Sequence, residues 1–98
     1  MIVRNIHDKE VLDTTYIAHG GAIAQMILDR RILKDIGFLA IARLGPGRQI
    51  EAHVDPMEEI YFVVSGTGQM RVDDKTRQVV PGDATWIPVG SVHALLNN

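Results

Sequence analysis

The chain lacks cysteine, an excess of positive charge and long apolar runs, and each absence removes a class of function. Without cysteine there is no disulfide, no thiolate metal site and no thiol nucleophile. The formal net charge of −2 leaves no basic stripe for a nucleic-acid backbone. The longest apolar runs, Phe38 to Ala42 and Ile60 to Val64, have five residues and are too short to span a bilayer. We therefore expect no nucleic-acid partner and no membrane partner.

The size of the chain limits where a functional site can lie. Its 98 residues suit a single domain with one small core. A site must then lie inside that core or at its mouth. The first residues lack the apolar stretch of a signal peptide, so we expect a cytoplasmic protein. Its chemistry must rest on histidine, aspartate and glutamate.

Short strands separated by glycine and proline turns dominate the chain after residue 36. Regular spacing of this kind predicts an all-β sandwich or barrel. The expected strands are 37–44, 49–53, 59–64, 69–72, 77–80, 85–87 and 92–96. Before them, Ile2 to Ile6 is a possible strand and 14–17 is β-prone, whereas residues 22–33 suit either a short helix or a strand.

The segment from Glu59 to Val64 carries the strongest strand signal. Glu59, Tyr61 and Val63 lie on one face of the expected strand, and Ile60, Phe62 and Val64 on the other. Both faces are apolar beyond Glu59, so both should be covered. One face would line a barrel lumen, and the other would need a second sheet layer or a partner subunit.

Histidines and carboxylates cluster around two of these strands. His53 and Asp55 share one side of an extended segment, Glu59 begins the next strand, and His93 follows a later turn. Two imidazoles with one or two carboxylates form a plausible site for a first-row metal. By spacing alone, ordinary surface or core histidines explain the pattern equally well.

Glycines and prolines around these residues complete two longer motifs. The first is Gly47-x5-His53-x-Asp55-x3-Glu59-x6-Gly66, and the second is Gly82-x5-Pro88-x-Gly90-x2-His93-x3-Asn97. They resemble the two motifs of the cupin superfamily, in particular its small single-domain members, and match at nine of ten fixed positions. The 15 residues between them, Thr67 to Pro81, are also typical of small cupins.

The resemblance implies a cupin-type double-stranded β-helix, a jelly-roll barrel in a single domain. Residues 37–98 would form the barrel core, with the first motif at 47–66 and the second at 82–97. Residues 1–36 would supply N-terminal strands that cover it. The resemblance also implies a divalent transition metal (Mn, Fe, Ni, Zn or Cu) in the barrel mouth, with His53, Glu59 and His93 as three of the usual four ligands.

Asp55 departs from the cupin pattern, because the second histidine of the family usually stands at this position. Three interpretations follow. Asp55 is a fourth ligand, which makes a harder site that favours Mn or Fe; or it is too short to reach and water completes the shell; or the metal is lost and a binding cup remains. A further alternative is the facial triad of iron oxygenases, formed here by His53, Asp55 and His93.

Other side chains receive lesser roles. Tyr61 and Trp86 are candidate walls of a substrate pocket, although packing alone also explains both. Glu58 is expected to face solvent. His7 and His19 lie in the least patterned part of the chain, and we expect no function for either.

These observations predict a small metal-binding cupin that acts as an enzyme on a small polar organic molecule. Dioxygenase, decarboxylase and isomerase chemistry all occur on this fold, and the fold does not choose among them. The alternative is a non-catalytic cup that binds or senses a small molecule without metal. Because the second motif ends beside Asn98, we expect the N-terminal strand or a partner to cover an open sheet edge, which favours a homodimer.

Overall fold

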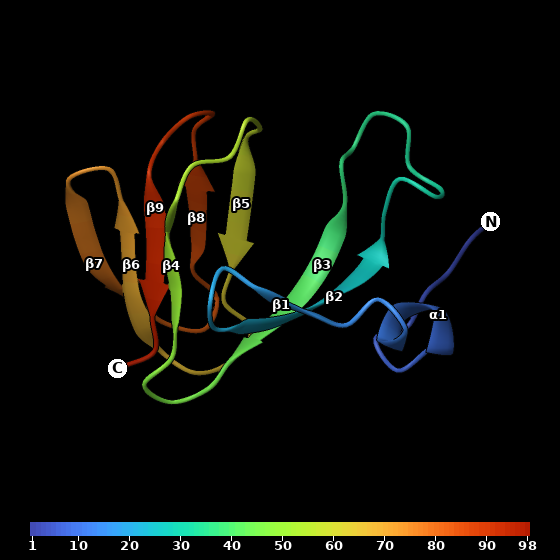
Figure 1. Cartoon of the computed structure of the whole chain (residues 1–98), viewed down its shortest axis with the longest axis horizontal. Coiled ribbons are helices and arrows are strands. Elements are labelled where there is room, and N and C mark those ends of the chain that lie inside the picture. The colour runs from blue at the N-terminus through green and yellow to red at the C-terminus, as the bar shows by residue number, and fades with distance from the viewer.

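Nine strands and one short helix make up the computed structural model, which describes residues 1–98 (Figure 1). The elements are α1 (Lys9–Leu12), β1 (Tyr16–Ala18), β2 (Ala22–Leu28), β3 (Leu39–Leu44), β4 (Gln49–His53), β5 (Glu59–Phe62), β6 (Gly68–Val72), β7 (Lys75–Val79), β8 (Ala84–Ile87) and β9 (His93–Leu96). The all-β prediction is confirmed. The single helix is far too short to cross a membrane.

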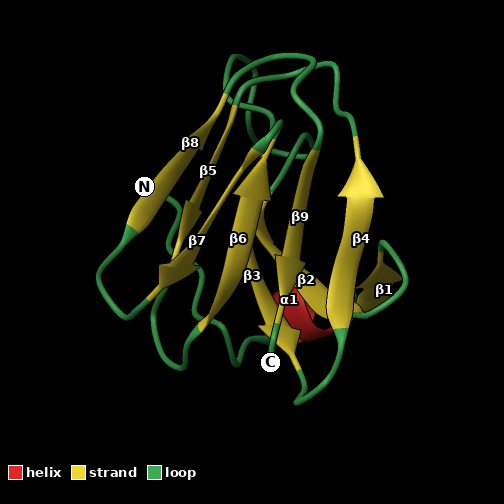
Figure 2. Ribbon diagram, turned by 90° about the vertical axis from the view of Figure 1, so that its left-hand side faces the viewer, coloured by secondary structure: helices red, strands yellow, loops and turns green.

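The strands form three antiparallel sheets (Figure 2). The largest has the order β4-β9-β6-β7, the second is β1-β2-β3, and the third is the pair β5-β8. The core lies where the largest sheet packs against β5 and β8, and its buried members are Met70, Val79 and Ile87. This is the jelly-roll arrangement that the resemblance implies, with apolar side chains of facing sheets packed between them.

Strand β5 is covered on one face only. Glu59 and Tyr61 are half-buried on the inner face, whereas Ile60 and Phe62 on the outer face are 70% and 62% exposed. The chain itself therefore covers the inner face of β5, as the sequence predicts, but leaves the outer face of β5 exposed.

The ambiguous segment 22–33 begins with a strand. Residues Ala22–Leu28 pair with β1 on one side and with β3 on the other, and these backbone hydrogen bonds decide between helix and strand. The expected strand from Ile2 to Ile6 is wrong, because these residues pair with no other strand. A turn follows, in which the Asn5 amide donates to the Asp8 carboxylate, and it leads into α1, which the sequence analysis did not predict.

The expected closure of a sheet edge by the N-terminus is also not observed. The N-terminal segment extends away from the strands (Figure 1). The last strand, β9, is not an edge, because it pairs with both β4 and β6. Asn97, at the end of the second motif, donates from Nδ2 to the Leu44 carbonyl at 2.8 Å. This hydrogen bond connects the C-terminal end of the chain to the last residue of β3.

Candidate metal centre

A β-bulge places His53 directly opposite His93. Ile50 pairs with Leu95, but the register then shifts, so that His53 and not Ala52 pairs with His93. Opposed residues of antiparallel strands point to the same face of the sheet, so both imidazoles enter the same space. Their ring centroids lie 4.1 Å apart with the planes at 60°. His93 is completely buried.

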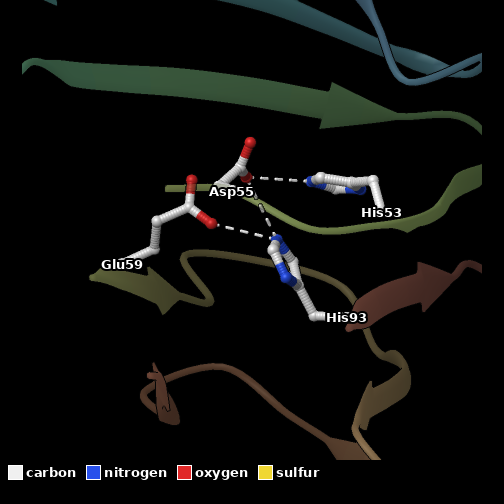
Figure 3. A group of neighbouring side chains, drawn as sticks. All are labelled: His53, Asp55, Glu59 and His93. Atoms are coloured by element: carbon white, nitrogen blue, oxygen red, sulfur yellow. Dashed lines mark ion pairs between the residues drawn. The ribbon is translucent and has the colours of Figure 1, made fainter. Parts of the chain in front are cut away.

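Two carboxylates complete the cluster (Figure 3). Asp55 lies in the β4–β5 loop, where its carbonyl accepts a hydrogen bond from the Gly90 amide at 3.2 Å. Glu59 begins β5 and pairs with Ile87. One possible ligand atom from each of His53, Asp55, Glu59 and His93 lies within 4.8 Å of all the others. We call these side chains the convergent group.

The distances within the convergent group are short. Asp55 Oδ2 lies 3.2 Å from His53 Nε2 and 3.5 Å from His93 Nε2. Glu59 Oε2 lies 2.9 Å from His93 Nε2 (Figure 3). The Asp55 side chain is therefore long enough to lie among the side chains of His53, Glu59 and His93. In the sequence it stands at the position where cupins usually carry a second histidine.

Backbone carbonyls orient both imidazoles. His53 Nδ1 donates to the Glu51 carbonyl at 2.7 Å, and His93 Nδ1 donates to the Ser91 carbonyl at 3.0 Å. A neutral imidazole that uses its Nδ1 proton in this way presents a lone pair on Nε2. Both Nε2 lone pairs face the centre of the convergent group, in the tautomer that metal-binding histidines adopt.

Acceptor atoms meet in this centre without a donor between them. His53 Nε2, His93 Nε2 and Glu59 Oε2 are buried and form no hydrogen bond. Buried polar atoms are rarely left unpaired, because desolvation without a partner is costly. Burial, together with the neighbouring Asp55 carboxylate, raises the pKa of Glu59 to about 7. Lone pairs and negative charge that converge in this way fit a bound cation.

Tyr61 lies beside this group and Trp86 does not. Tyr61 is half-buried, and its ring meets the His93 ring edge-on at 5.8 Å between centroids. Burial and the nearby Glu59 carboxylate raise the pKa of Tyr61. Trp86 pairs with Ile60 on the outer face and is 61% exposed, so the expectation that it lines the same cup does not match its position. Its indole Nε1 donates to Glu58, which is exposed as expected.

His19 is the neighbour that sequence reasoning missed. Its ring stacks on His53 with 3.4 Å between centroids and 10° between planes. Partial burial, with a smaller contribution from His53, lowers the pKa of His19. His19 lies in the turn between β1 and β2, far from both motifs in the sequence, and no local pattern brings these rings together. The Gly20-Gly21 pair beside it was the available signal, since it marks a tight turn.

A family model for the cupin domain matches residues 40–98, which is more than half of the chain. The chain is a cupin. This membership confirms the resemblance to cupins that the two motifs carry, and the architecture of the strands agrees with it.

Two curated relatives of undescribed function match most of the chain. The chain is 31% identical over 99 residues to the uncharacterized protein MJ1618 of Methanocaldococcus jannaschii, a match that covers 98% of this cupin and 76% of that protein. It is 30% identical over 82 residues to the uncharacterized protein SCO3923 of Streptomyces coelicolor. This match covers 84% of this cupin and 73% of SCO3923. A shorter match, 49% over 39 residues, links it to the alginate biosynthesis protein AlgA of Pseudomonas aeruginosa, but covers 40% of this chain and only 8% of AlgA.

Solved structures share the fold over nearly the whole chain. A protein of Thermotoga maritima described as a predicted oxalate decarboxylase superposes with a TM-score of 0.80 at 25% identity, covering 99% of this cupin and 87% of that chain. The polyketide cyclase RemF of Streptomyces resistomycificus superposes with a TM-score of 0.78 at 20% identity. The superposition covers 99% of this cupin and 71% of RemF. The RemF match shows the fold alone.

Proposed function

We propose that this cupin is a cytoplasmic metalloenzyme that acts on a small polar organic molecule, with a divalent metal held by His53, Asp55, Glu59 and His93. The observation that carries the proposal is the convergent group itself. Its buried acceptor atoms face one another and find no donor within the protein. A cation would satisfy all of them at once.

The donor set indicates which metal fits best. Two imidazole nitrogens and two carboxylate oxygens make a harder site than one with an additional histidine in place of Asp55. Carboxylate oxygens suit Mn and Fe, whereas additional imidazole favours Ni, Cu or Zn. We therefore expect Mn or Fe in preference to the others. Bound there, the metal would supply Lewis-acid or oxygen-activating chemistry.

The chain's own residues then shape and polarise the cup. Tyr61, with its raised pKa, stays protonated near neutral pH and keeps a phenolic donor beside His93. The carbonyls of Glu51 and Ser91 hold both imidazoles in the tautomer that leaves Nε2 unprotonated. A small anionic or polar molecule is the substrate that such a site accommodates. The neighbour described as a predicted oxalate decarboxylase makes small carboxylates the first substrates to assay.

Metal content tests this proposal. Purified protein is stripped, reconstituted with Mn, Fe, Ni, Cu or Zn in turn, and assayed for bound metal by elemental analysis. We expect about one metal per chain for the wild type and a loss of nearly all of it in His93→Ala. The matched control is His7→Ala, since His7 is exposed in the N-terminal turn outside the convergent group. Wild-type protein that stays below stoichiometric metal after every reconstitution would refute the proposal.

A non-catalytic binding cup is the second candidate function. Asp55 favours it, because the family's usual fourth ligand is replaced. In that case a small carboxylate would raise the unfolding temperature of the protein, and metal-loaded protein would show no turnover of it.

We also propose that the protein forms a homodimer through the outer face of β5 and β8. Ile60, Phe62 and Trp86 lie on this face, and each is more than 60% exposed. A contiguous apolar patch of this kind usually marks an interface. Burial against a second copy would supply the outer cover that the chain itself does not provide.

A further inference from the structure

The turn that carries His19 adopts an unusual backbone conformation. His19 has a φ of 46° and Gly20 a φ of 81°. Positive values at both central positions are typical of a type I′ turn, which the Gly21 amide closes by donating to the Ala18 carbonyl at 3.2 Å. A left-handed backbone is unfavourable for a residue with a Cβ atom. A histidine at this position therefore needs contacts that compensate.

Strand β4 holds this turn in place. The Glu51 amide donates to the His19 carbonyl at 2.9 Å. A Cβ atom at Gly21 would lie 2.2 Å from the Gln49 carbonyl oxygen, so the turn packs against β4 more closely than any side chain allows. The position of His19 relative to β4 is therefore set by the backbone and not by the side chain alone.

The same residue of β4, Glu51, also holds His53. The Glu51 amide binds His19, while the Glu51 carbonyl accepts the hydrogen bond from His53 Nδ1 at 2.7 Å. The two rings stand nearly parallel at 3.4 Å, and His93 contacts His53 at an angle. His53 is thus restrained by a hydrogen bond, by a stacked ring and by the opposed imidazole.

We propose that His19 is a positioning residue for His53: by stacking on the His53 ring, it fixes the ring plane and keeps Nδ1 on the Glu51 carbonyl, so that Nε2 points into the convergent group. His19 lies outside the convergent group and acts only through His53. The effect on metal affinity rests on the proposed function, whereas the effect on the ring of His53 does not.

The test uses two substitutions at one backbone position. His19→Asn removes the ring but suits a left-handed backbone, because asparagine tolerates positive φ. His19→Phe keeps an aromatic ring that can stack. The tautomer of His53 is read from nitrogen chemical shifts in the metal-free protein, at a pH where the histidines are neutral. The affinity for Mn²⁺ is measured by competition with a chelator, and unfolding temperatures confirm that all variants are folded.

We expect wild type and His19→Phe to hold His53 in a single tautomer, and His19→Asn to show a mixture. The affinity for Mn²⁺ should fall about tenfold in His19→Asn, as for other residues that orient a ligand, and recover in His19→Phe. The proposal would be overturned if His19→Asn kept the single His53 tautomer and the Mn²⁺ affinity of the wild type. It would also be overturned if His19→Asn and His19→Phe lost the single tautomer and the affinity to the same extent. If the wild type binds no metal but the tautomer still changes in His19→Asn, the proposed metal function fails while the positioning role of His19 stands.

Discussion

His53 and His93 face each other across β4 and β9 because one extra residue is inserted between Ile50 and His53. Without that bulge, the regular alternation of the strand would place Ala52 opposite His93, and His53 would point to the other face. The register shift therefore places the two imidazoles in one space. Bulges are frequent beside functional sites for this reason.

Replacing Asp55 by histidine should change the metal preference of the site. Asp55→His substitutes an imidazole for a carboxylate and restores the usual cupin pattern. We expect the affinity for Ni, Cu or Zn to rise relative to that for Mn by about tenfold or more, because an imidazole suits these metals better. Competition between metal pairs, followed by elemental analysis, measures this ratio. The control is Asp74→His in the exposed β6–β7 turn, and an Asp55→His ratio equal to that of the control would contradict the assignment.

Metal affinity should increase with pH up to about 7. The pKa of Glu59 is raised to about 7, so at lower pH the metal must displace a proton from this carboxyl. The other groups facing Glu59 are Asp55, His53, His93 and Tyr61. Isothermal titration of Mn²⁺ between pH 5.5 and 8, in buffers of different ionisation enthalpy, reports both the affinity and the number of protons released on binding. Glu59→Gln should release fewer protons than wild type, whereas Glu58→Gln should not differ from it.

Stability of the metal-free protein should depend on pH in the opposite sense. A carboxyl whose pKa is raised on folding binds its proton more tightly in the folded state. Its stabilising contribution is present below the unfolded pKa of 4.5 and is lost as pH rises through about 7. Urea unfolding across this range should show a decline for wild type that Glu59→Gln reduces. A Glu59→Gln profile with the wild-type slope would exclude Glu59 as the source.

Glycine at position 21 should be essential for the contact between the β1–β2 turn and β4. Gly21→Ala places a Cβ atom 2.2 Å from a backbone oxygen, which the chain can relieve only by moving the turn. We expect a loss of about 1–3 kcal/mol in the free energy of unfolding, the range typical of overpacking. Gly37→Ala is the control, because a Cβ there meets nothing within 4 Å, and it should change stability by less than about 0.5 kcal/mol. Similar losses in both variants would argue against the close approach.

The outer face of β5 should determine the oligomeric state. Ile60→Ser removes an apolar side chain that is 70% exposed on this face, and Ile36→Ser removes one that is 66% exposed in the β2–β3 loop. Sedimentation equilibrium should show a dimer for wild type and for Ile36→Ser, and a shift towards monomer for Ile60→Ser. A monomeric wild type, or a dimer that Ile60→Ser leaves intact, would contradict the proposed interface.

Strand positions after residue 36 could be predicted from the sequence because their signals are local. β-Branched and aromatic residues between glycine and proline turns located most strands to within a residue or two. The first 36 residues were harder to assign. Ile2 to Ile6 has strand composition but no partner edge, and Ala22–Leu28 is a strand because β1 and β3 pair with it. Composition cannot supply a partner.

The sequence by itself determined the family, the all-β class and the identity of the convergent side chains, because the spacing of the two motifs carries that information. Only the tertiary structure decided how they meet. The bulge that turns His53 towards His93, the reach of Asp55 to His93 and the stacking of His19 on His53 each depend on contacts between segments distant in the chain. Such contacts follow from strand pairing and packing, and no local pattern of residues encodes them.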